Sequence, residues 1–294
     1  PTLLTVVAKN TNDSPVNGTT INWEIISGGG SLSASTSKTD SNGIATISYT
    51  LGTVVGSAVI RARIQSTQYY VDFNANSEHG TVSSLSLSAI PSSSTVGSNF
   101  SITVTAKDLY NNTVLNYPGT VTVTSSDSQA VLPLASVLTS GTTNFTINLR
   151  TAGNQTVTFG DGSLSVTTGN ILVNPASSQI TITQGNNQSE YRGTQLPIDL
   201  KAVVKDVYNN IISGATVDWA VASGGGSLSG TTVATNGSGV VQATWTLGVT
   251  PGTQTVTATI HGTSTLVTFT ATATTVALSS NTWNFNSANV LDFI

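Results

Sequence analysis

The strongest constraint on the fold of this chain is an internal repeat at a separation of 196 residues. At this separation Trp23 aligns with Trp219, and the run Ser-Gly-Gly-Gly-Ser-Leu-Ser at 27–33 aligns with the same run at 223–229. Phe73 aligns with Phe269 in the same register, without a gap over about seventy residues. Chance does not produce such a register, so the two stretches are copies of one structural unit.

A divergent third copy lies between these two. Half of the separation, 98 residues, is close to the ~100 residues of an immunoglobulin sandwich. Lys107–Asn112 lies 98 positions before the similar run Lys205–Asn210, although the middle copy has no matching tryptophan and no run of three glycines. We therefore predict three modules, at residues 1–78, 79–176 and 177–275.

The two ends of the chain depart from this pattern. Nothing before Leu3 can supply a first strand, so we expect module 1 to begin at its second strand. Residues 276–294 have two interpretations. They begin a further module, or they form a strand-donating tail, since Val290–Ile294 is apolar. The second interpretation predicts self-assembly by strand exchange between chains.

Apolar and polar residues alternate within each module. Ser101–Ala106 and Thr255–Ile260 have a period of two, which is typical of strands with one buried and one solvated face. Asn-Gly, Asp-Gly and Pro-Gly pairs separate such runs and indicate turns. No segment has the apolar period of a helix. In module 3 we predict strands near 178–184, 196–205, 215–222, 238–247, 252–261 and 264–273.

The predicted fold class is all-β: three tandem immunoglobulin-like antiparallel β-sandwiches arranged as an elongated rod. The rise per residue of a strand, with loops added, predicts a rod of roughly 100–120 Å. Trp219 is expected on the third strand of module 3, pointing into the core, and Trp23 in the equivalent place. We predict that the structural core includes Trp23, Trp219, Phe73 and Phe269.

Composition argues against a membrane span, against nucleic-acid binding and against stabilisation by disulfides. Only 7% of the residues are charged, but no apolar run approaches the ~18–20 residues of a membrane span. Nine Lys and Arg residues are scattered singly against 13 Asp and Glu residues, which argues against nucleic acid as a partner. Cysteine is absent, so each module must be held together by its core rather than by disulfides.

Modules 1 and 3 resemble bacterial Ig-like repeat domains of the intimin/invasin type. The resemblance is carried by Asn17-Gly18 or Ser213-Gly214 before the tryptophan strand, the Ser-Gly-Gly-Gly-Ser-Leu-Ser run, Thr39–Ala45, the Leu-Gly pair, and Gly56 or Gly252 before a Val/Ala/Ile strand. Module 2 resembles the wider bacterial Ig-like group loosely. The resemblance implies secreted or surface-exposed rods, often in adhesins and sometimes in phage tail proteins or beside enzymes. It implies no catalytic residues.

Candidate sites for small ligands have simpler structural interpretations. A phosphate loop needs Lys-Ser/Thr and a helix after its glycines, whereas Ser-Leu-Ser and a strand follow here, so we predict a tight turn or bulge. Asp108 and Asp206 each precede an Asn-Asn pair, and one carboxylate per loop favours a turn over a calcium site. A cation between modules, held with Glu78, Glu190 or Asp127, stays as the alternative. We predict no catalytic residues, no metal ligands and no cofactor.

Tyrosines are the side chains that we single out for binding, because they offer a large amphipathic contact area at small entropic cost. The candidate binding aromatics are Tyr69, Tyr70, Tyr117 and Tyr191.

The function that the sequence favours is a non-catalytic stalk or spacer of a secreted or cell-surface bacterial adhesin or fibre. Its expected partners are neighbouring Ig-like modules of a longer chain, and its expected location is extracellular or on the bacterial surface. The alternatives are a module that recognises a carbohydrate or protein receptor, and the accessory region of a secreted enzyme or phage tail fibre. The sequence names no receptor or glycan.

Overall fold

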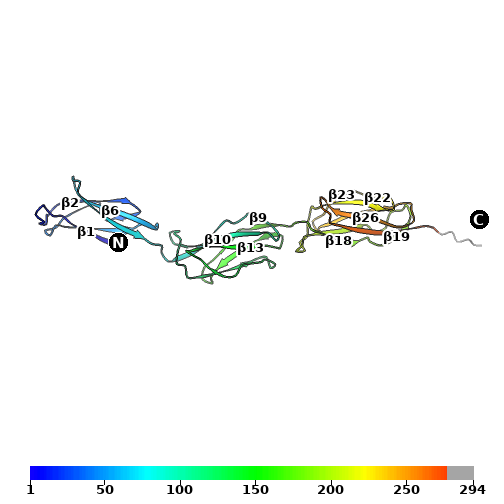
Figure 1. Cartoon of the computed structure of the whole chain (residues 1–294), viewed down its shortest axis with the longest axis horizontal. Helices are drawn as coiled ribbons and strands as arrows, with labels where there is room; N and C mark the ends of the chain where they lie inside the picture. Colours follow the sequence, from blue (N-terminus) through cyan, green and yellow to red (C-terminus); the bar gives the residue numbers. More distant parts are fainter. Residues whose placement is uncertain (277–294) are drawn as a thin grey trace, which may run out of the picture. The chain divides into compact units, whose positions relative to one another are not determined.

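The computed structural model describes residues 1–276, and these residues form β-strands joined by turns and loops (Figure 1). They contain no helix, so the all-β prediction is confirmed. Accordingly, nothing in this part of the chain is a helix long and apolar enough to cross a bilayer. The chain divides into two compact units, Pro1–Leu172 and Val173–Ile294, which we describe separately.

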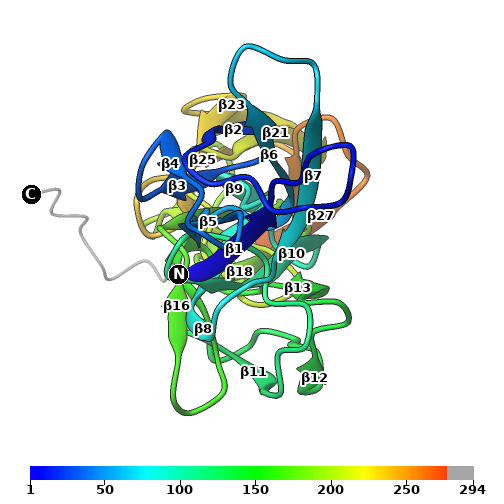
Figure 2. The same cartoon turned by 90° about the vertical axis from the view of Figure 1, so that its left-hand side faces the viewer.

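The first group of strands in unit 1, which we call the first sandwich, spans residues 2–77. One sheet has the order β1-β5-β3 and the other has the order β4-β2-β6-β7. Figure 2 labels these strands. Their bounds are β1 (Thr2–Val7), β2 (Thr20–Ser27), β3 (Gly30–Leu32), β4 (Thr36–Lys38), β5 (Ile44–Leu51), β6 (Gly56–Ile64) and β7 (Tyr70–Ser77).

The second sandwich spans residues 82–174 and has three sheets, with the orders β13-β10-β8, β12-β11-β15-β16 and β14-β17-β9. Phe145 and Phe159 meet in its interior, with ring centroids 5.5 Å apart. The bounds are β8 (Val82–Ser88), β9 (Ser93–Thr95), β10 (Asn99–Asp108), β11 (Thr120–Ser125), β12 (Ser136–Val137), β13 (Thr142–Asn148), β14 (Gly153–Gln155), β15 (Val157–Gly160), β16 (Ser165–Thr167) and β17 (Ile171–Asn174).

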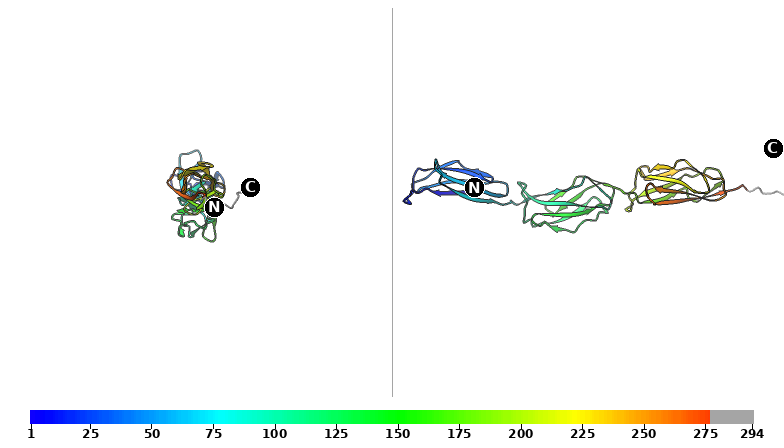
Figure 3. Two further views of the ribbon diagram at one scale, coloured as in Figure 1. Left: turned by 90° about the vertical axis from the view of Figure 1, so that its right-hand side faces the viewer. Right: turned by 45° about the horizontal axis from the view of Figure 1, so that its top comes forward.

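The third sandwich, residues 179–274, lies in unit 2. Its sheets have the orders β18-β20-β24, β19-β27-β26-β21-β23 and β22-β25, and its strands can be followed in the right-hand panel of Figure 3. The bounds are β18 (Gln179–Gln184), β19 (Gln188–Tyr191), β20 (Leu200–Lys205), β21 (Thr216–Ser223), β22 (Gly226–Leu228), β23 (Thr232–Ala234), β24 (Val240–Ala243), β25 (Trp245–Leu247), β26 (Gly252–Ile260) and β27 (Leu266–Thr274).

Strand pairing follows the sequence repeat. Within residues 1–276, each strand that pairs in a sheet has its partners in the same sandwich. The exact module boundaries, 1–78, 79–176 and 177–275, stay a prediction. The same holds for the further module or strand-donating tail predicted at 276–294, because all of it except Val276 lies outside the described residues.

The six strands predicted in module 3 are all present near the predicted positions, with two differences. The predicted strand 238–247 is divided into β24 and β25, which pair with different partners. In addition, β19, β22 and β23 were not predicted, because strands of three or four residues show almost no alternation.

The antiparallel pairing has an exception in the third sandwich. β19 pairs with β27 in parallel, from Gln188 opposite Ala271 to Tyr191 opposite Thr274. The preceding strand β18 pairs with β20 in the opposite sheet. The chain therefore changes sheets between β18 and β19, and it does so without reversing into a hairpin.

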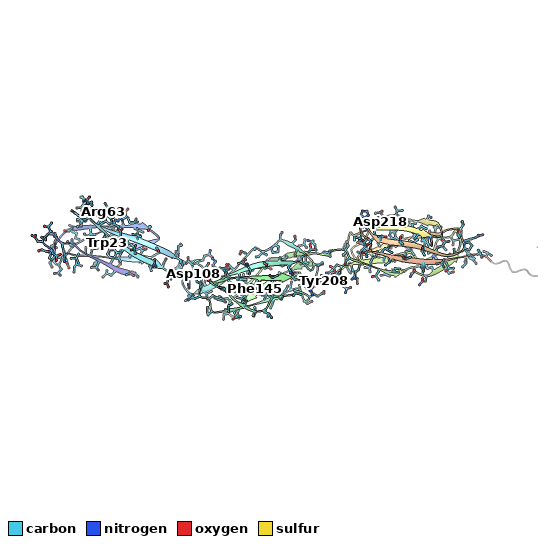
Figure 4. All side chains as sticks on the ribbon, viewed as in Figure 1. Trp23, Arg63, Asp108, Phe145, Tyr208 and Asp218 are labelled. Atoms are coloured by element: carbon cyan, nitrogen blue, oxygen red, sulfur yellow. The ribbon has the colours of Figure 1, made fainter. Side chains whose placement is uncertain are left out.

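The first and third sandwiches each contain an aromatic pair between their two sheets. Trp23 and Phe73 have ring centroids 6.0 Å apart, and Trp219 and Phe269 have centroids 5.4 Å apart. Trp23, Trp219 and Phe269 are buried, whereas Phe73 is partly exposed. Figure 4 labels Trp23 and, in the second sandwich, Phe145. Since no disulfide is available, this apolar burial is the main source of stability.

The run of three glycines forms a close turn, as predicted. Gly30 and Gly226 both have positive φ, 120° and 100°, and each begins a short strand. A β-carbon at Gly226 would collide with the carbonyl oxygen of Thr246, and one at Gly30 would collide with that of Thr50. Glycine is therefore required for both its φ and its lack of a side chain.

We predict unequal effects of removing the two phenylalanines. Phe269→Ala should destabilise the third sandwich by about 3–5 kcal/mol, because the ring is fully buried. Phe73→Ala should cost the first sandwich clearly less, because solvent already reaches part of this ring. Hydrogen-exchange mass spectrometry in increasing urea measures peptides of β26–β27 and β6–β7 separately. Equal losses would contradict the difference in packing.

Candidate functional site

Charged and aromatic side chains gather on the outer face of β6 and β7 in the first sandwich. Glu24, Arg61 and Asp72 lie opposite one another on β2, β6 and β7, and Arg63 lies opposite Tyr70. Arg61 donates from Nε to Asp72 Oδ1 and from Nη2 to Oδ2, both at 2.7 Å. We call Arg61, Arg63, Tyr70 and Asp72 the arginine–tyrosine face; Figure 4 labels Arg63.

Tyr70 completes this face through ring contacts with both arginines. The Cζ of Arg61 lies 3.8 Å from the centroid of the Tyr70 ring, and that of Arg63 lies 5.6 Å away. A guanidinium at such distances is attracted by the ring quadrupole. The hydrogen bonds from Arg61 hold the pKa of Asp72 below its usual value and outweigh the effect of desolvation. The carboxylate therefore stays ionised and orders Arg61.

The repeat shows that this face has no counterpart in the third sandwich. At the separation of 196 residues, Arg61 and Arg63 correspond to Thr257 and Thr259, and Asp72 corresponds to Thr268. We did not single out these charged residues from the sequence. The sequence signal that could have identified them is a charged residue in one copy where the other copy has threonine at the equivalent outward position.

Three of the four candidate tyrosines reach solvent. Tyr69 is 67% exposed, Tyr70 54% and Tyr191 52%. Tyr69 and Tyr70 are adjacent at the start of β7, whereas Tyr191 ends β19 in unit 2. Of these, Tyr70 contacts the arginines, and Tyr69 precedes it in the chain.

Tyr117 does not offer a binding surface. It is only 6% exposed, and its hydroxyl donates to Asp161 Oδ2 at 2.6 Å. Burial and the hydrogen-bonded carboxylate raise the pKa of Tyr117. The backbone N–H of Leu164 and the Tyr117 hydroxyl hold the pKa of Asp161 below its usual value. Tyr117 therefore anchors a loop of the second sandwich, and its position in the core was not evident from a sequence without alternation around it.

Asp108 and Asp206 form matching turns. Asp108 Oδ1 accepts hydrogen bonds from the backbone N–H groups of Tyr110 and Asn112, at 2.9 and 2.8 Å. Asp206 Oδ1 accepts the equivalent bonds from Tyr208 and Asn210, at 2.8 and 2.9 Å. The carboxylates are 3% and 1% exposed, so they point into their own turns. This geometry is that of an Asx turn.

Asp108 has an additional partner outside its turn. Its Oδ2 accepts from the side chain of Asn112 and from the backbone N–H of Gly80, both at 2.9 Å. The hydrogen bonds from the Asn112 side chain and from the backbone donors lower the pKa of Asp108 to about 2, and they outweigh desolvation, which raises it. Asn112 also donates to the carbonyl oxygen of Thr53 at 2.8 Å, so this turn contacts the first sandwich within unit 1.

The acidic residues considered for an intermodule cation do not converge. Asp127 accepts from the backbone N–H groups of Arg150, Thr151 and Gln129. Within residues 1–276, no three His, Cys, Asp or Glu side chains are grouped as a metal site requires.

The first 76 residues match a known family. Residues 1–76 match the bacterial Ig-like domain (group 1), which confirms the resemblance drawn from the sequence. No curated protein matches the chain.

Several solved structures of bacterial proteins are similar to this chain. The Escherichia coli adhesin FdeC is 18% identical, with a TM-score of 0.58, and the match covers 92% of each chain. Yersinia pseudotuberculosis InvD is 15% identical with a TM-score of 0.49, covering 91% of each chain. Invasin, a bacterial integrin-binding protein, is 20% identical with a TM-score of 0.46, covering 92% of this chain and 56% of that one. The likeness to FdeC shows the Ig-like fold.

The pKa of Asp108 predicts how its replacement depends on pH. Above pH 4 the carboxylate is ionised in both folded and unfolded chains, and its bonds stabilise the fold. Its folded pKa of about 2 lies below the unfolded value of ~3.9, so this contribution is lost as pH falls from 4 to 2. Asp108→Asn should therefore be destabilised at pH 7, and the difference from the parent chain should shrink toward pH 2. Urea unfolding at several pH values measures this; a constant difference would contradict it.

Proposed function

We propose that this chain is a non-catalytic spacer of a bacterial surface adhesin, and that it transmits tension through its sandwiches. The observation that carries the proposal is the parallel pairing of β19 with β27. The described chain enters the third sandwich through β18 and β19 and leaves it through β27. Tension on the two ends pulls β19 toward its N-terminus and β27 toward its C-terminus. Parallel strands pulled in this way are sheared, so their hydrogen bonds are loaded together.

Side chains reinforce the beginning of this pair. The backbone N–H of Asn187 donates to the carbonyl oxygen of Thr270 at 2.8 Å. The Oδ1 of Asn186 accepts from the backbone N–H of Thr270 at 2.8 Å, and the Thr270 hydroxyl donates to Asn187 Oδ1. At the other end, the N–H of Arg192 donates to the carbonyl oxygen of Thr274 at 3.0 Å. Hydrogen bonds therefore flank the β19–β27 pair at both of its ends.

The comparisons support the adhesin part of the proposal. The match of residues 1–76 to a bacterial Ig-like domain and the fold shared with an Escherichia coli adhesin agree with a location outside the bacterial cell. In such a setting a module without disulfides needs mechanical resistance from its backbone ladders. We propose neighbouring Ig-like modules of a longer chain as the partners.

A mechanical measurement tests the spacer proposal. Asn186→Ala removes the acceptor for the Thr270 N–H, and it should lower the force at which the third sandwich unfolds in single-molecule pulling from the chain ends. Gln242→Ala changes an exposed residue on β24 and serves as the control that should leave the force unchanged. If Asn186→Ala and Gln242→Ala unfold at the same force, the β19–β27 pair does not bear the tension.

The arginine–tyrosine face favours a second candidate function, recognition of a carbohydrate or protein receptor. Exposed tyrosines beside a guanidinium are a common composition of binding surfaces. Tyr69→Ala combined with Tyr70→Ala should then lower ligand capture on a glycan array and in a pull-down by at least about tenfold. Tyr191→Ala, in unit 2, is the matched control and should have no effect. Equal capture by both variants would remove this candidate.

A further inference from the structure

One side chain of the second sandwich makes two hydrogen bonds to the backbone of the first. Asn112 Nδ2 donates to the carbonyl oxygen of Thr53 at 2.8 Å, and Asn112 Oδ1 accepts from the backbone N–H of Val55 at 3.1 Å. Thr53 and Val55 lie in the loop between β5 and β6. A single carboxamide, with its donor and its acceptor, therefore satisfies two backbone groups of another sandwich.

The turn that carries Asn112 does not need this carboxamide in order to form. At a separation of 98 residues, Ser14 of the first sandwich corresponds to Asn112. Asn10, which corresponds to Asp108, accepts from the backbone N–H of Ser14 at 3.0 Å and closes an Asx turn there as well. Serine is therefore sufficient at this position of the turn. What the carboxamide of Asn112 adds is the contact with the β5–β6 loop.

Asp108 orients Asn112 and also holds the segment that joins the two sandwiches. The Oδ2 of Asp108, which is labelled in Figure 4, accepts from Asn112 Nδ2 and from the backbone N–H of Gly80, both at 2.9 Å. Gly80 belongs to residues 78–81, which connect β7 to β8. The same carboxylate therefore contacts the covalent connection and the side chain that makes the second contact.

The loop that receives Asn112 is tied to the first sandwich. The hydroxyl of Ser77, at the end of β7, donates to the carbonyl oxygen of Val54 at 2.6 Å. Val54 lies between the two residues that Asn112 contacts. The hydrogen bonds of Asn112 are therefore made to a segment that is itself held by a strand of the sandwich.

We propose that Asn112 is a latch that holds the first and second sandwiches in one orientation, and that residues 78–81 act as a hinge when the latch is released. A short covalent connection alone leaves two domains free to move relative to each other, unless further contacts restrict them. Asn112 supplies two such contacts at points away from the connection. The latch lies outside the β19–β27 pair, so this proposal does not rest on the spacer function.

One position in the receiving loop decides whether both hydrogen bonds can form, because the latch contacts backbone atoms. Val55 corresponds to Pro251 in the third sandwich, at the separation of 196 residues. Proline has no backbone N–H, so the equivalent loop offers such a carboxamide only the carbonyl oxygen of Val249. The chain therefore contains one loop that allows the full latch and one that allows half of it.

Distance measurement between two spin labels by pulsed electron paramagnetic resonance tests the latch, and the absence of cysteine allows specific labelling. The labels are attached at Thr46→Cys on β5 and Thr146→Cys on β13, both of them exposed strand positions. The labelled parent chain should give one narrow distance distribution. Asn112→Ser, which copies Ser14, removes the carboxamide and should broaden the distribution at least about twofold, because the hinge then samples several orientations.

Val55→Pro tests the same contact from the side of the first sandwich. It removes one of the two hydrogen bonds, and Pro251 occupies the equivalent place in the third sandwich. This variant should broaden the distribution less than Asn112→Ser does. The two changes together should broaden it no more than Asn112→Ser alone, because both act on one contact.

Asn210→Ser is the matched control. Asn210 occupies the equivalent position in the turn of the third sandwich and lies outside unit 1, so its replacement should leave the distance distribution unchanged. Circular dichroism checks that every labelled variant is folded.

Two results would overturn the proposal. A parent chain with the same width of distribution as Asn112→Ser would show that Asn112 does not hold the joint. Broadening by Asn112→Ser without any broadening by Val55→Pro would show that the serine acts through its own turn and not through the contact with the β5–β6 loop.

Discussion

Burial of alternating side chains between two sheets is the interaction on which each sandwich depends. Without cysteine, and with few charged residues, the chain has no other large source of stability. The aromatic pairs Trp23–Phe73 and Trp219–Phe269 occupy the centre of this burial in the first and third sandwiches. Outward positions are consequently free to vary, and threonine in one copy stands where another copy has arginine or aspartate.

The first and third sandwiches act as a comparison within one molecule. Their central strands share a register, and Phe73 and Phe269 pack on equivalent tryptophans. Their burial differs because β18 and β19 cover only the third core. The same two strands complete the third core and place the parallel β19–β27 pair where the chain enters and leaves this sandwich.

The two equivalent tryptophans also differ in their hydrogen bonding. Trp23 Nε1 donates to the Ser37 hydroxyl at 2.9 Å, whereas the counterpart of Ser37 is Val233. Trp219 Nε1 is consequently buried without a hydrogen-bond partner. An unpaired buried donor is unfavourable. Phe269 is nevertheless more deeply buried than Phe73. The first sandwich therefore has a hydrogen-bonded tryptophan, whereas the third has the more deeply buried phenylalanine.

The sequence by itself determined the all-β class, the repeat, the aromatic core and the longer strands, because a period of two and an exact register are local properties. It could not reveal β19, β22 and β23, since three or four residues carry almost no periodicity. Nor could it separate buried Tyr117 from exposed Tyr70, because isolated tyrosines look alike until a partner such as Asp161 or Arg61 is placed beside them. Only the tertiary structure decided the parallel β19–β27 pair and the arginine–tyrosine face. Each of these arises from strands distant in sequence that pack together, and such packing leaves no pattern in any single segment.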